Sequence, residues 1–152
     1  MRISQQIFPR HVAIVVVGSN AMTASFLMPV SFDPKYIAFS ISPKRYTFQL
    51  IQKEKYFSIN MLEKDQKEIA IFCGTLSGRN VNKLEKLEVE EGKYTKIIDC
   101  PISFECEKVF MKEFGDHNIV VGKVLKEKVR KKEFIPLLHY SGDKFATRLA
   151  FD

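Results

Sequence analysis

Continuous apolar runs, rather than a helical spacing of apolar residues, dominate the first half of the chain. Residues 12–17 read VAIVVV, a β-branched run typical of a central strand that is buried on both faces. Shorter or interrupted runs predict further strands at residues 22–30, 36–42 and 56–62. The first half of the chain is therefore expected to be mostly β.

Helical signals are few and short. Residues 43–55 predict one helix, because Ser42 is a favoured N-cap and Pro43 suits the first helical position. Residues 65–72 predict a second helix, with Gly74 as its C-terminal stop. Helices are therefore expected to play a minor part in the fold.

The second half of the chain predicts a hairpin and a barrel. Residues 102–114 and 118–126 predict two strands joined at Gly115-Asp116, a dipeptide that favours a tight turn, and residues 136–142 predict a loop. About seven strands with two or three short helices favour a closed or nearly closed β-barrel, because an open sheet would expose its edges. Without repeats or a linker, residues 1–152 are expected to form a single mainly β domain.

Composition fits a globular protein, with 45% hydrophobic and 28% charged residues and a net charge of +6. No apolar run approaches the roughly 20 residues needed to span a bilayer, so no membrane association is expected. Residues 12–17 are too short for a secretion signal and lack a convincing cleavage site, which favours a cytoplasmic protein.

The densest basic run is residues 123–132, KVLKEKVRKK. It alternates lysine with apolar residues, which favours a solvated edge strand or hairpin whose lysines prevent pairing with other strands. Nucleic-acid binding is the alternative, but the chain contains no recognisable helix-turn-helix, zinc-finger or RNA-binding motif. A nucleic-acid partner is therefore not expected.

Cysteine and histidine spacing gives no metal motif. The cysteines are odd in number, lack a C-x-x-C pair and have no histidine at zinc spacing; they are Cys73, Cys100 and Cys106. Buried, reduced thiols and no metal site are expected. The alternative is a Cys/His cluster that forms only on folding.

Two segments carry residues suited to one phosphate group. In residues 40–47 a strand end runs into a predicted helix N-terminus, and in residues 75–83 a polar loop leads into a short helical turn. Their hydroxyls, glycine and cations are Ser40, Ser42, Arg45, Thr47, Ser77, Gly78, Arg79 and Lys83. A phosphomonoester offers about two negative charges and three acceptor oxygens to such groups. Small residues at 22–25 suggest a planar phosphorylated cofactor, the alternative being that these cations are solvated surface charges.

Several of these segments resemble the flavin reductase-like, FMN-binding split-barrel family. The resemblance is carried by NAMTASF at residues 20–26, PVSFDP at 29–34 and FSISPKRYT at 39–47. Further matching segments follow in the family's order: FSINML at 57–62, Ser77-Gly78-Arg79 with Lys83, Gly115-Asp116-His117 and Pro136-Leu137-Leu138. The resemblance covers nearly the whole chain and implies a six-stranded split barrel, usually a homodimer, that binds FMN near the subunit interface.

The resemblance also implies roles for individual residues. The segment along the flavin ring would comprise Asn20, Met22, Thr23, Ala24 and Ser25. The ribityl chain and phosphate would be held by Ser40, Ile41, Ser42, Arg45, Thr47, Ser77, Gly78, Arg79 and Lys83. His117 would lie near the nicotinamide or the flavin edge and steer a hydride donor or supply a proton, or be a structural hairpin histidine. His139 and Tyr140 would close over the flavin from the partner chain. Alternatively, they would pack in the core or at the subunit interface.

Two departures qualify the resemblance. Gly18-Ser19 connects the first strand to the NAMTASF segment almost directly, where many members carry a longer hairpin. No G-x-G-x-x-G motif is present, so NADH or NADPH would bind only transiently, on the flavin.

The function implied is an FMN-dependent oxidoreductase that takes hydride from NADH or NADPH and passes electrons to free flavin, ferric complexes or a protein acceptor. The first alternative is an FMN-binding electron carrier without NAD(P)H oxidation of its own. A second alternative, a basic nucleic-acid-binding barrel, would require salt-sensitive binding without retained flavin.

Overall fold

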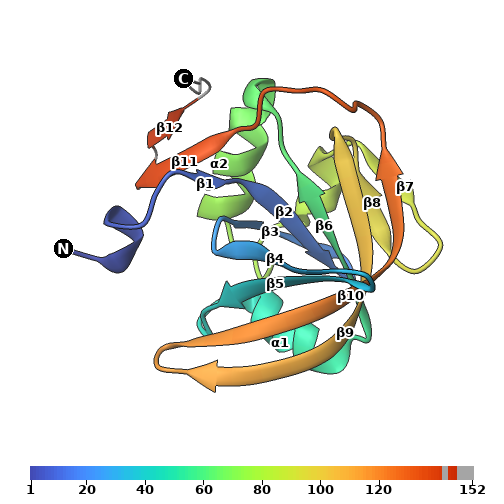
Figure 1. Cartoon of the computed structure of the whole chain (residues 1–152), viewed down its shortest axis with the longest axis horizontal. Helices are drawn as coiled ribbons and strands as arrows, with labels where there is room; N and C mark the ends of the chain where they lie inside the picture. Colours follow the sequence, from blue (N-terminus) through green and yellow to red (C-terminus); the bar gives the residue numbers. More distant parts are fainter. Residues whose placement is uncertain (142–143, 147–152) are drawn as a thin grey trace.

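A seven-stranded antiparallel sheet forms the centre of the molecule (Figure 1). The structure is a computed structural model that describes residues 1–141 and 144–146. The strands of the sheet follow the order β3-β2-β6-β9-β10-β5-β4. In that order they span Asn20–Ala24, Ala13–Val17, Tyr56–Met61, Ile102–Phe114, His117–Val129, Lys35–Ile41 and Leu27–Phe32. The prediction of a mainly β chain is confirmed.

The sheet closes on itself at one corner. Its two outermost strands, β3 and β4, are consecutive along the chain, and only Ser25 and Phe26 lie between them. The sheet must therefore curl until its two edges approach each other at this corner, although β3 and β4 are not paired with each other in the described part of the chain. This curvature gives the predicted barrel. The Ser40 N–H donates to the Phe26 carbonyl at 2.8 Å and ties the corner to β5.

This corner also corrects one prediction. Residues 22–30 do not form a single strand, because β3 pairs with β2 at one edge of the sheet and β4 pairs with β5 at the other. The chain changes edge at Ser25 and Phe26, where the strand is interrupted. The sheet consequently has seven strands instead of the six implied by the resemblance.

The apolar run of β2 is explained by burial on both faces. Ala13, Val15 and Val17 belong to the core inside the barrel, whereas Ile14 and Val16 belong to a second core. That second core includes Ala70 and Cys73 of α2, Leu84 and Leu137. The prediction of a central strand buried on both faces is confirmed.

The remaining elements cover the ends and the outer side of the barrel. The helices are α1 (Tyr46–Lys53) and α2 (Lys67–Thr75), and the 3-10 turns are η1 (Ile3–Gln5), η2 (Lys64–Gln66) and η3 (Lys83–Lys86). One small sheet has the order β1-β11-β12, with β1 at Arg10–His11, β11 at Leu138–Ser141 and β12 at Lys144–Ala146. The other pairs β7 (Val89–Glu91) with β8 (Lys96–Ile98).

Residues 136–142, predicted as a loop, contain the strand β11. Its buried Leu138 pairs with His11 of β1, so the edge of β1 turns this segment into a strand. Residue 142 itself lies outside the described residues. The pairing was not predictable locally, because its partner is more than a hundred residues away in the sequence.

Helix α1 begins later than predicted. Pro43 is not its first residue but occupies the second position of a turn, which the Arg45 N–H closes by donating to the Ser42 carbonyl at 3.0 Å. Arg45 is the N-cap, and no side chain caps the helix. The first turn of α1 therefore starts with uncapped backbone N–H groups.

Helix α2 both begins and ends later than the predicted residues 65–72, since it spans Lys67–Thr75. Gly74 lies within it and does not end it; a Cβ at this position would come 3.3 Å from the Cβ of Thr23 on β3. The glycine thus allows α2 to pack closely against β3.

The predicted hairpin at Gly115-Asp116 is confirmed, and Gly115 has the positive φ of 62° that the turn requires. The basic run at residues 123–132 is the far part of this hairpin and the segment after it. Beyond Lys123, strand β10 pairs only with β9. Lys128 and Arg130 both form ion pairs with Glu90, so part of this charge is neutralised within the chain.

The three cysteines are free and buried, as predicted. Within residues 1–141 and 144–146, no group of three or more His, Cys, Asp or Glu side chains is arranged to hold a metal ion. No helix in the same part of the chain is long and apolar enough to cross a membrane.

Candidate functional site

The two predicted phosphate-binding segments meet around one hollow of about 150 Å³, here called the cationic hollow. One wall is the turn before α1 together with its first residues, and the other is the loop between α2 and η3. Strand β3 forms the floor. The lining residues are Asn20, Met22, Lys44, Arg45, Tyr46, Thr47, Thr75, Leu76, Ser77, Gly78, Arg79 and Lys83.

The hollow carries an excess of positive charge. Among the described residues that line it there are two lysines and two arginines but no aspartate or glutamate. Burial lowers the pKa of Lys83; the neighbouring Cys73 opposes this change and the nearby Arg45 adds to it. Like charges that lack an anion between them repel each other, so the hollow favours an anionic ligand.

Lys83 also has a structural role. Its side chain is buried, and its ammonium donates to the Ala21 carbonyl at 2.9 Å and to the Cys73 carbonyl at 2.8 Å. It therefore ties β3 to α2. Two of its three N–H donors are used in this way.

Asn20 presents a buried acceptor at the edge of the hollow. Its amide nitrogen donates to the hydroxyl of Thr47 at 2.8 Å, and both residues are buried. Its amide oxygen, by contrast, has no hydrogen-bond partner among the described residues. A buried unpaired carbonyl costs stability, so a ligand that donates a hydrogen bond here would be favoured.

The 77–80 turn packs tightly onto Asn20. A Cβ at Gly78 would lie 2.1 Å from the Asn20 Oδ1 and 2.8 Å from the Tyr46 ring, so only glycine fits. The Arg79 guanidinium lies over the Tyr46 ring, 5.3 Å from its centroid. These contacts fix the backbone of the turn at the rim of the hollow.

Two further hollows continue from the cationic hollow towards the barrel corner. The α2 hollow, of about 200 Å³, shares Arg45 and Thr75 with the cationic hollow and also includes Thr23, Ser25 and His139. The apolar hollow, of about 370 Å³, shares Ser25 with the α2 hollow and lies between the N-terminal segment and strands β4 and β5. The three hollows thus follow one another past β3.

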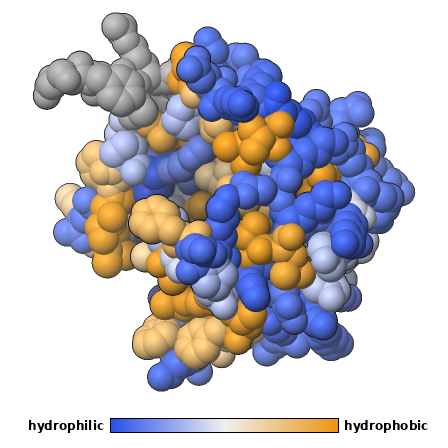
Figure 2. All heavy atoms as spheres, turned by 45° about the vertical axis from the view of Figure 1, so that its right-hand side comes forward, coloured by the Kyte–Doolittle hydropathy of each residue, from blue (hydrophilic) through white to orange (hydrophobic). Residues whose placement is uncertain are grey.

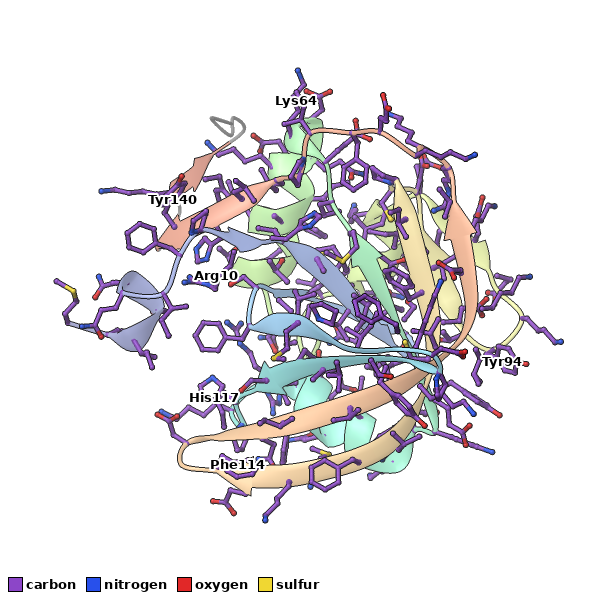
Figure 3. All side chains as sticks on the ribbon, viewed as in Figure 1. Arg10, Lys64, Tyr94, Phe114, His117 and Tyr140 are labelled. Carbon is purple, nitrogen blue, oxygen red and sulfur yellow. The ribbon has the colours of Figure 1, made fainter. Side chains whose placement is uncertain are left out.

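A corner cluster, formed by Arg10, Ser25 and His139, lies where the last two hollows meet. The Arg10 Nε donates to the Ser25 hydroxyl at 3.3 Å, and its Nη2 contacts the Nδ1 of His139 at 3.0 Å. The guanidinium also lies over the Phe26 ring at 5.4 Å. Figure 3 shows Arg10 between the N-terminal turn and the corner strands, with Tyr140 above it.

The structure brings most of the predicted residues to these hollows. Eight line the cationic hollow: Asn20, Met22, Arg45, Thr47, Ser77, Gly78, Arg79 and Lys83. Thr23 and Ser25 line the α2 hollow, and Ser40 lines the apolar hollow. Thr23 already uses its hydroxyl, which donates to the Ala70 carbonyl at 2.5 Å.

Four predicted residues do not line any of the three hollows. The side chains of Ala24 and Ile41 face the barrel core, because strand alternation places them opposite Thr23 and Ser40. Ser42 lies in the turn before α1, where its hydroxyl accepts from the Lys44 N–H at 3.3 Å. The fourth is His117.

His117 lies at the start of β10, below Arg10 in Figure 3. Its Nδ1 contacts the Asp116 carboxylate at 2.8 Å, and this contact lowers the pKa of Asp116. Its ring is 5.8 Å from that of Phe26, the corner residue. Among the described residues, Phe26 is therefore the one that links His117 to the corner.

Sequence reasoning missed Arg10, Gly74 and Thr75 as residues of the site. Gly74 was interpreted as a helix stop, which hid its close packing on Thr23. Arg10 belongs to no local motif. Its role depends on β1 pairing with β11, which brings His139 beside it.

Comparison with known proteins gives consistent results. A family model described as flavin reductase like domain matches residues 4–148. A protein of Archaeoglobus fulgidus is 33% identical over an alignment of 129 residues, which covers 80% of this chain and 73% of that protein. The FMN reductase (NADH) of Agrobacterium fabrum is 28% identical over 109 residues, covering 72% of this chain and 62% of its own length. The FMN-binding protein of Thermus thermophilus superposes with a TM-score of 0.87 at 28% identity, covering 93% of this chain and 88% of that structure.

Proposed function

Because this chain belongs to the flavin reductase-like family and has its split-barrel fold, we propose that it is an FMN-dependent oxidoreductase. It would take hydride from NADH or NADPH and pass electrons to free flavin, a ferric complex or a protein acceptor. Two similar proteins, an FMN reductase (NADH) and an FMN-binding protein, support this assignment.

The observation that carries the proposal is the composition of the cationic hollow. Four cations and the hydroxyls of Thr47, Thr75 and Ser77 surround it, without a carboxylate among its described lining. A phosphomonoester would accept hydrogen bonds from these cations and from the hydroxyl of Ser77, and it would neutralise the repulsion between Arg45 and Lys83. The hydroxyl of Thr75 already donates to the Ile71 carbonyl at 2.8 Å. The uncapped start of α1 adds N–H donors on the same side.

The residues present fit FMN beyond its phosphate. The unpaired Asn20 Oδ1 is an acceptor, which a phosphate dianion would not satisfy but a ribityl hydroxyl would. Neighbouring hollows share lining residues, which would give the ring a path along Thr23 and Ser25 towards the corner. The apolar hollow is walled by Phe26, Leu27 and Phe39 and would exclude water from that end.

Bound FMN would supply the two-electron chemistry, accepting hydride from a nicotinamide and releasing electrons to an acceptor. The chain's own residues bind and orient it. Arg45, Arg79 and Lys83 would hold the phosphate, Asn20 and Thr47 the sugar chain, and Ser25 the ring. We keep His117 as a candidate active-site residue through its contact with Phe26.

An FMN-binding electron carrier is the alternative, since the same hollows would serve it. Purified protein mixed anaerobically with NADH or NADPH separates the two functions. Bleaching of the flavin absorption by the nicotinamide within seconds supports the reductase. Bleaching by dithionite alone supports the carrier.

The phosphate assignment is tested by Arg45→Ala combined with Arg79→Ala. Two charge-assisted contacts are removed, so FMN affinity should fall about 100-fold or more, whereas riboflavin affinity should change about twofold. Lys112→Ala with Lys126→Ala, on the exposed hairpin, is the matched control for charge. Equal losses for FMN and riboflavin would contradict the assignment.

We also propose a homodimer. Exposed apolar side chains occur on the N-terminal segment and on β4, among them Ile7, Phe8, Met28 and Phe32. Phe32 is 96% exposed, an unusual environment for a phenylalanine in an isolated chain. On the face shown in Figure 2, hydrophobic side chains are more frequent on the left and along the lower edge, whereas the right-hand part is mostly hydrophilic. Sedimentation at micromolar concentration tests this state.

A further inference from the structure

We propose that Arg10 is a positioning residue that acts through Ser25: it holds and polarises the Ser25 hydroxyl, which donates to the ring of bound FMN and favours the reduced flavin. The inference rests on the proposed function. It concerns the corner cluster, which is separate from the cationic hollow that would hold the phosphate.

The guanidinium of Arg10 is fully engaged by the protein. Besides Ser25 and His139, it donates to the backbone carbonyls of Tyr140 at 3.3 Å, Ser4 at 2.7 Å and Ile7. An arginine has five N–H donors, and five acceptors are present here. Arg10 is therefore fixed in direction and has no donor left for a ligand, so any effect on a ligand passes through its neighbours or its charge.

The contact with His139 determines which partner donates. A guanidinium only donates, so the Nδ1 of His139 that faces it acts as the acceptor of this hydrogen bond. Nδ1 has only one lone pair, which the Arg10 N–H at 3.0 Å occupies. The Ser25 hydroxyl, at 3.3 Å from the same nitrogen, competes poorly for it.

The Ser25 hydroxyl is consequently able to donate its proton to a ligand. Its oxygen accepts from the Arg10 Nε, which leaves its own proton for an acceptor on the other side. Ser25 is half-buried and lines both the α2 hollow and the apolar hollow, so that side is where the ring would lie. A hydroxyl that accepts from a cation is a stronger donor, because hydrogen bonds in a chain polarise one another.

Such a donor matters most where negative charge grows. Reduction places charge on the ring nitrogens and carbonyl oxygens of a flavin, so a fixed donor stabilises the reduced form more than the oxidised form. The measurable quantity is the ratio of the dissociation constants of oxidised and reduced FMN, obtained from the midpoint potentials of bound and free FMN.

Arg10→Gln should lower this ratio about tenfold, which for a two-electron couple is a fall of about 30 mV in midpoint potential. The affinity for oxidised FMN should stay within about twofold. Ser25→Ala should give a similar fall, and the double variant should show no larger fall than Ser25→Ala alone. Ser25→Thr, which keeps the hydroxyl, should retain most of the wild-type ratio.

The matched control is Arg2→Gln, which removes the same charge from the exposed N-terminal segment. It should leave the ratio unchanged. Additive falls in the double variant would show that Arg10 does not act through Ser25, and an unchanged ratio in Ser25→Ala would overturn the proposal outright. A protein that binds no FMN at all would instead refute the proposed function.

Arg10 also anchors the N-terminal segment, so Arg10→Gln risks unfolding it. In that case Arg10→Lys replaces it, since lysine keeps the charge but has too few donors for five acceptors. Arg10→Lys must then lower the ratio of the two dissociation constants when Ser25 is present. In the Ser25→Ala background it must cause no further fall. A fall that persists in the Ser25→Ala background contradicts the proposal.

Discussion

The cationic hollow and the corner cluster both place positive charge beside β3, but they treat it in opposite ways. In the hollow, Arg45 lies close enough to Lys83 to add to the lowering of the Lys83 pKa, and no described carboxylate lines the space. In the corner, every N–H of Arg10 has an acceptor from the protein. The cations of the hollow need an anion to relieve their repulsion, whereas Arg10 needs no ligand because all of its donors are bonded within the protein.

This difference separates two uses of a cation. An unsatisfied group of cations recruits a charged ligand and gains stability when the ligand binds. A satisfied cation cannot recruit, but it holds its neighbours in one orientation before any ligand arrives. Affinity should therefore depend on the hollow, and the properties of the bound ligand on the corner.

The largest expected effect comes from supplying the hollow with its own anion. Asn20→Asp places a carboxylate among the cations at the position of the unpaired Oδ1. FMN affinity should fall about 100-fold or more through repulsion of the phosphate, whereas riboflavin affinity should change only severalfold. Fluorescence quenching titrations measure both.

Asn20→Ala is the control for loss of the side chain. It removes the hydrogen bond to Thr47 without adding charge, and should weaken FMN and riboflavin by a similar factor of about ten. If Asn20→Asp weakened FMN no more than Asn20→Ala does, the hollow would not be a phosphate site.

A smaller effect is expected from removing the cation that also serves the fold. Lys83→Met keeps the length of the side chain but loses both hydrogen bonds to the carbonyls of Ala21 and Cys73. The free energy of unfolding of the apoprotein should fall by about 2 kcal/mol, measured by urea denaturation. The exposed Lys86 on the same 3-10 turn gives the matched control, Lys86→Met, which should change little.

A more stable Lys83→Met variant would reverse this interpretation. It would mean that the desolvation of the buried ammonium outweighs its two hydrogen bonds, as occurs for some buried charges. The residue would then be kept for the ligand alone.

The smallest expected effect is on pH dependence. The pKa of Lys83 is lowered by burial, so its ammonium loses a proton at a pH below its ordinary 10.5. As the pH rises through that lowered pKa, FMN affinity should fall severalfold relative to riboflavin affinity, because a cation of the phosphate site is lost. Titration of the flavin ring is common to both ligands and cancels in the ratio.

The stability of the apoprotein should change in the opposite direction. Between the lowered pKa and 10.5 the unfolded chain binds more protons at Lys83 than the folded chain, so the contribution of Lys83 to stability rises with pH. Lys83→Met should lack this rise. A wild-type profile parallel to that of the variant would contradict the assignment.

The sequence was informative where a structure depends on neighbours along the chain. Strand β2 was predicted because its alternating residues face two cores and are all apolar. The sequence also predicted that residues 40–47 and 75–83 share one site, because each segment carries its own hydroxyls and cations. The structure confirms this for residues 44–47, 75–79 and Lys83, whereas Ser40 and Ser42 do not line the cationic hollow. Pro43 misled the prediction of α1, since proline suits the second position of a turn as well as a helix start.

Features that depend on distant pairing were not predictable in the same way. The break at Ser25 and Phe26 exists because the barrel has to change edge there, which no local pattern records. The corner cluster joins residues 10, 25 and 139, and only the pairing of β1 with β11 brings them together. The pair β7–β8 was missed because its strands are three residues each, too short to give an alternating pattern.

Lys83 also affects the edge of the central sheet. Strand β3 is outermost, and an outermost strand can template the addition of a strand from another molecule. The carbonyl of Ala21 is already bound by the Lys83 ammonium, and α2 packs alongside. At the opposite edge, Pro29 removes one N–H from β4. Both edges of the sheet are thus poor templates for the addition of a strand, which protects the protein from fibrous aggregation through its sheet edges.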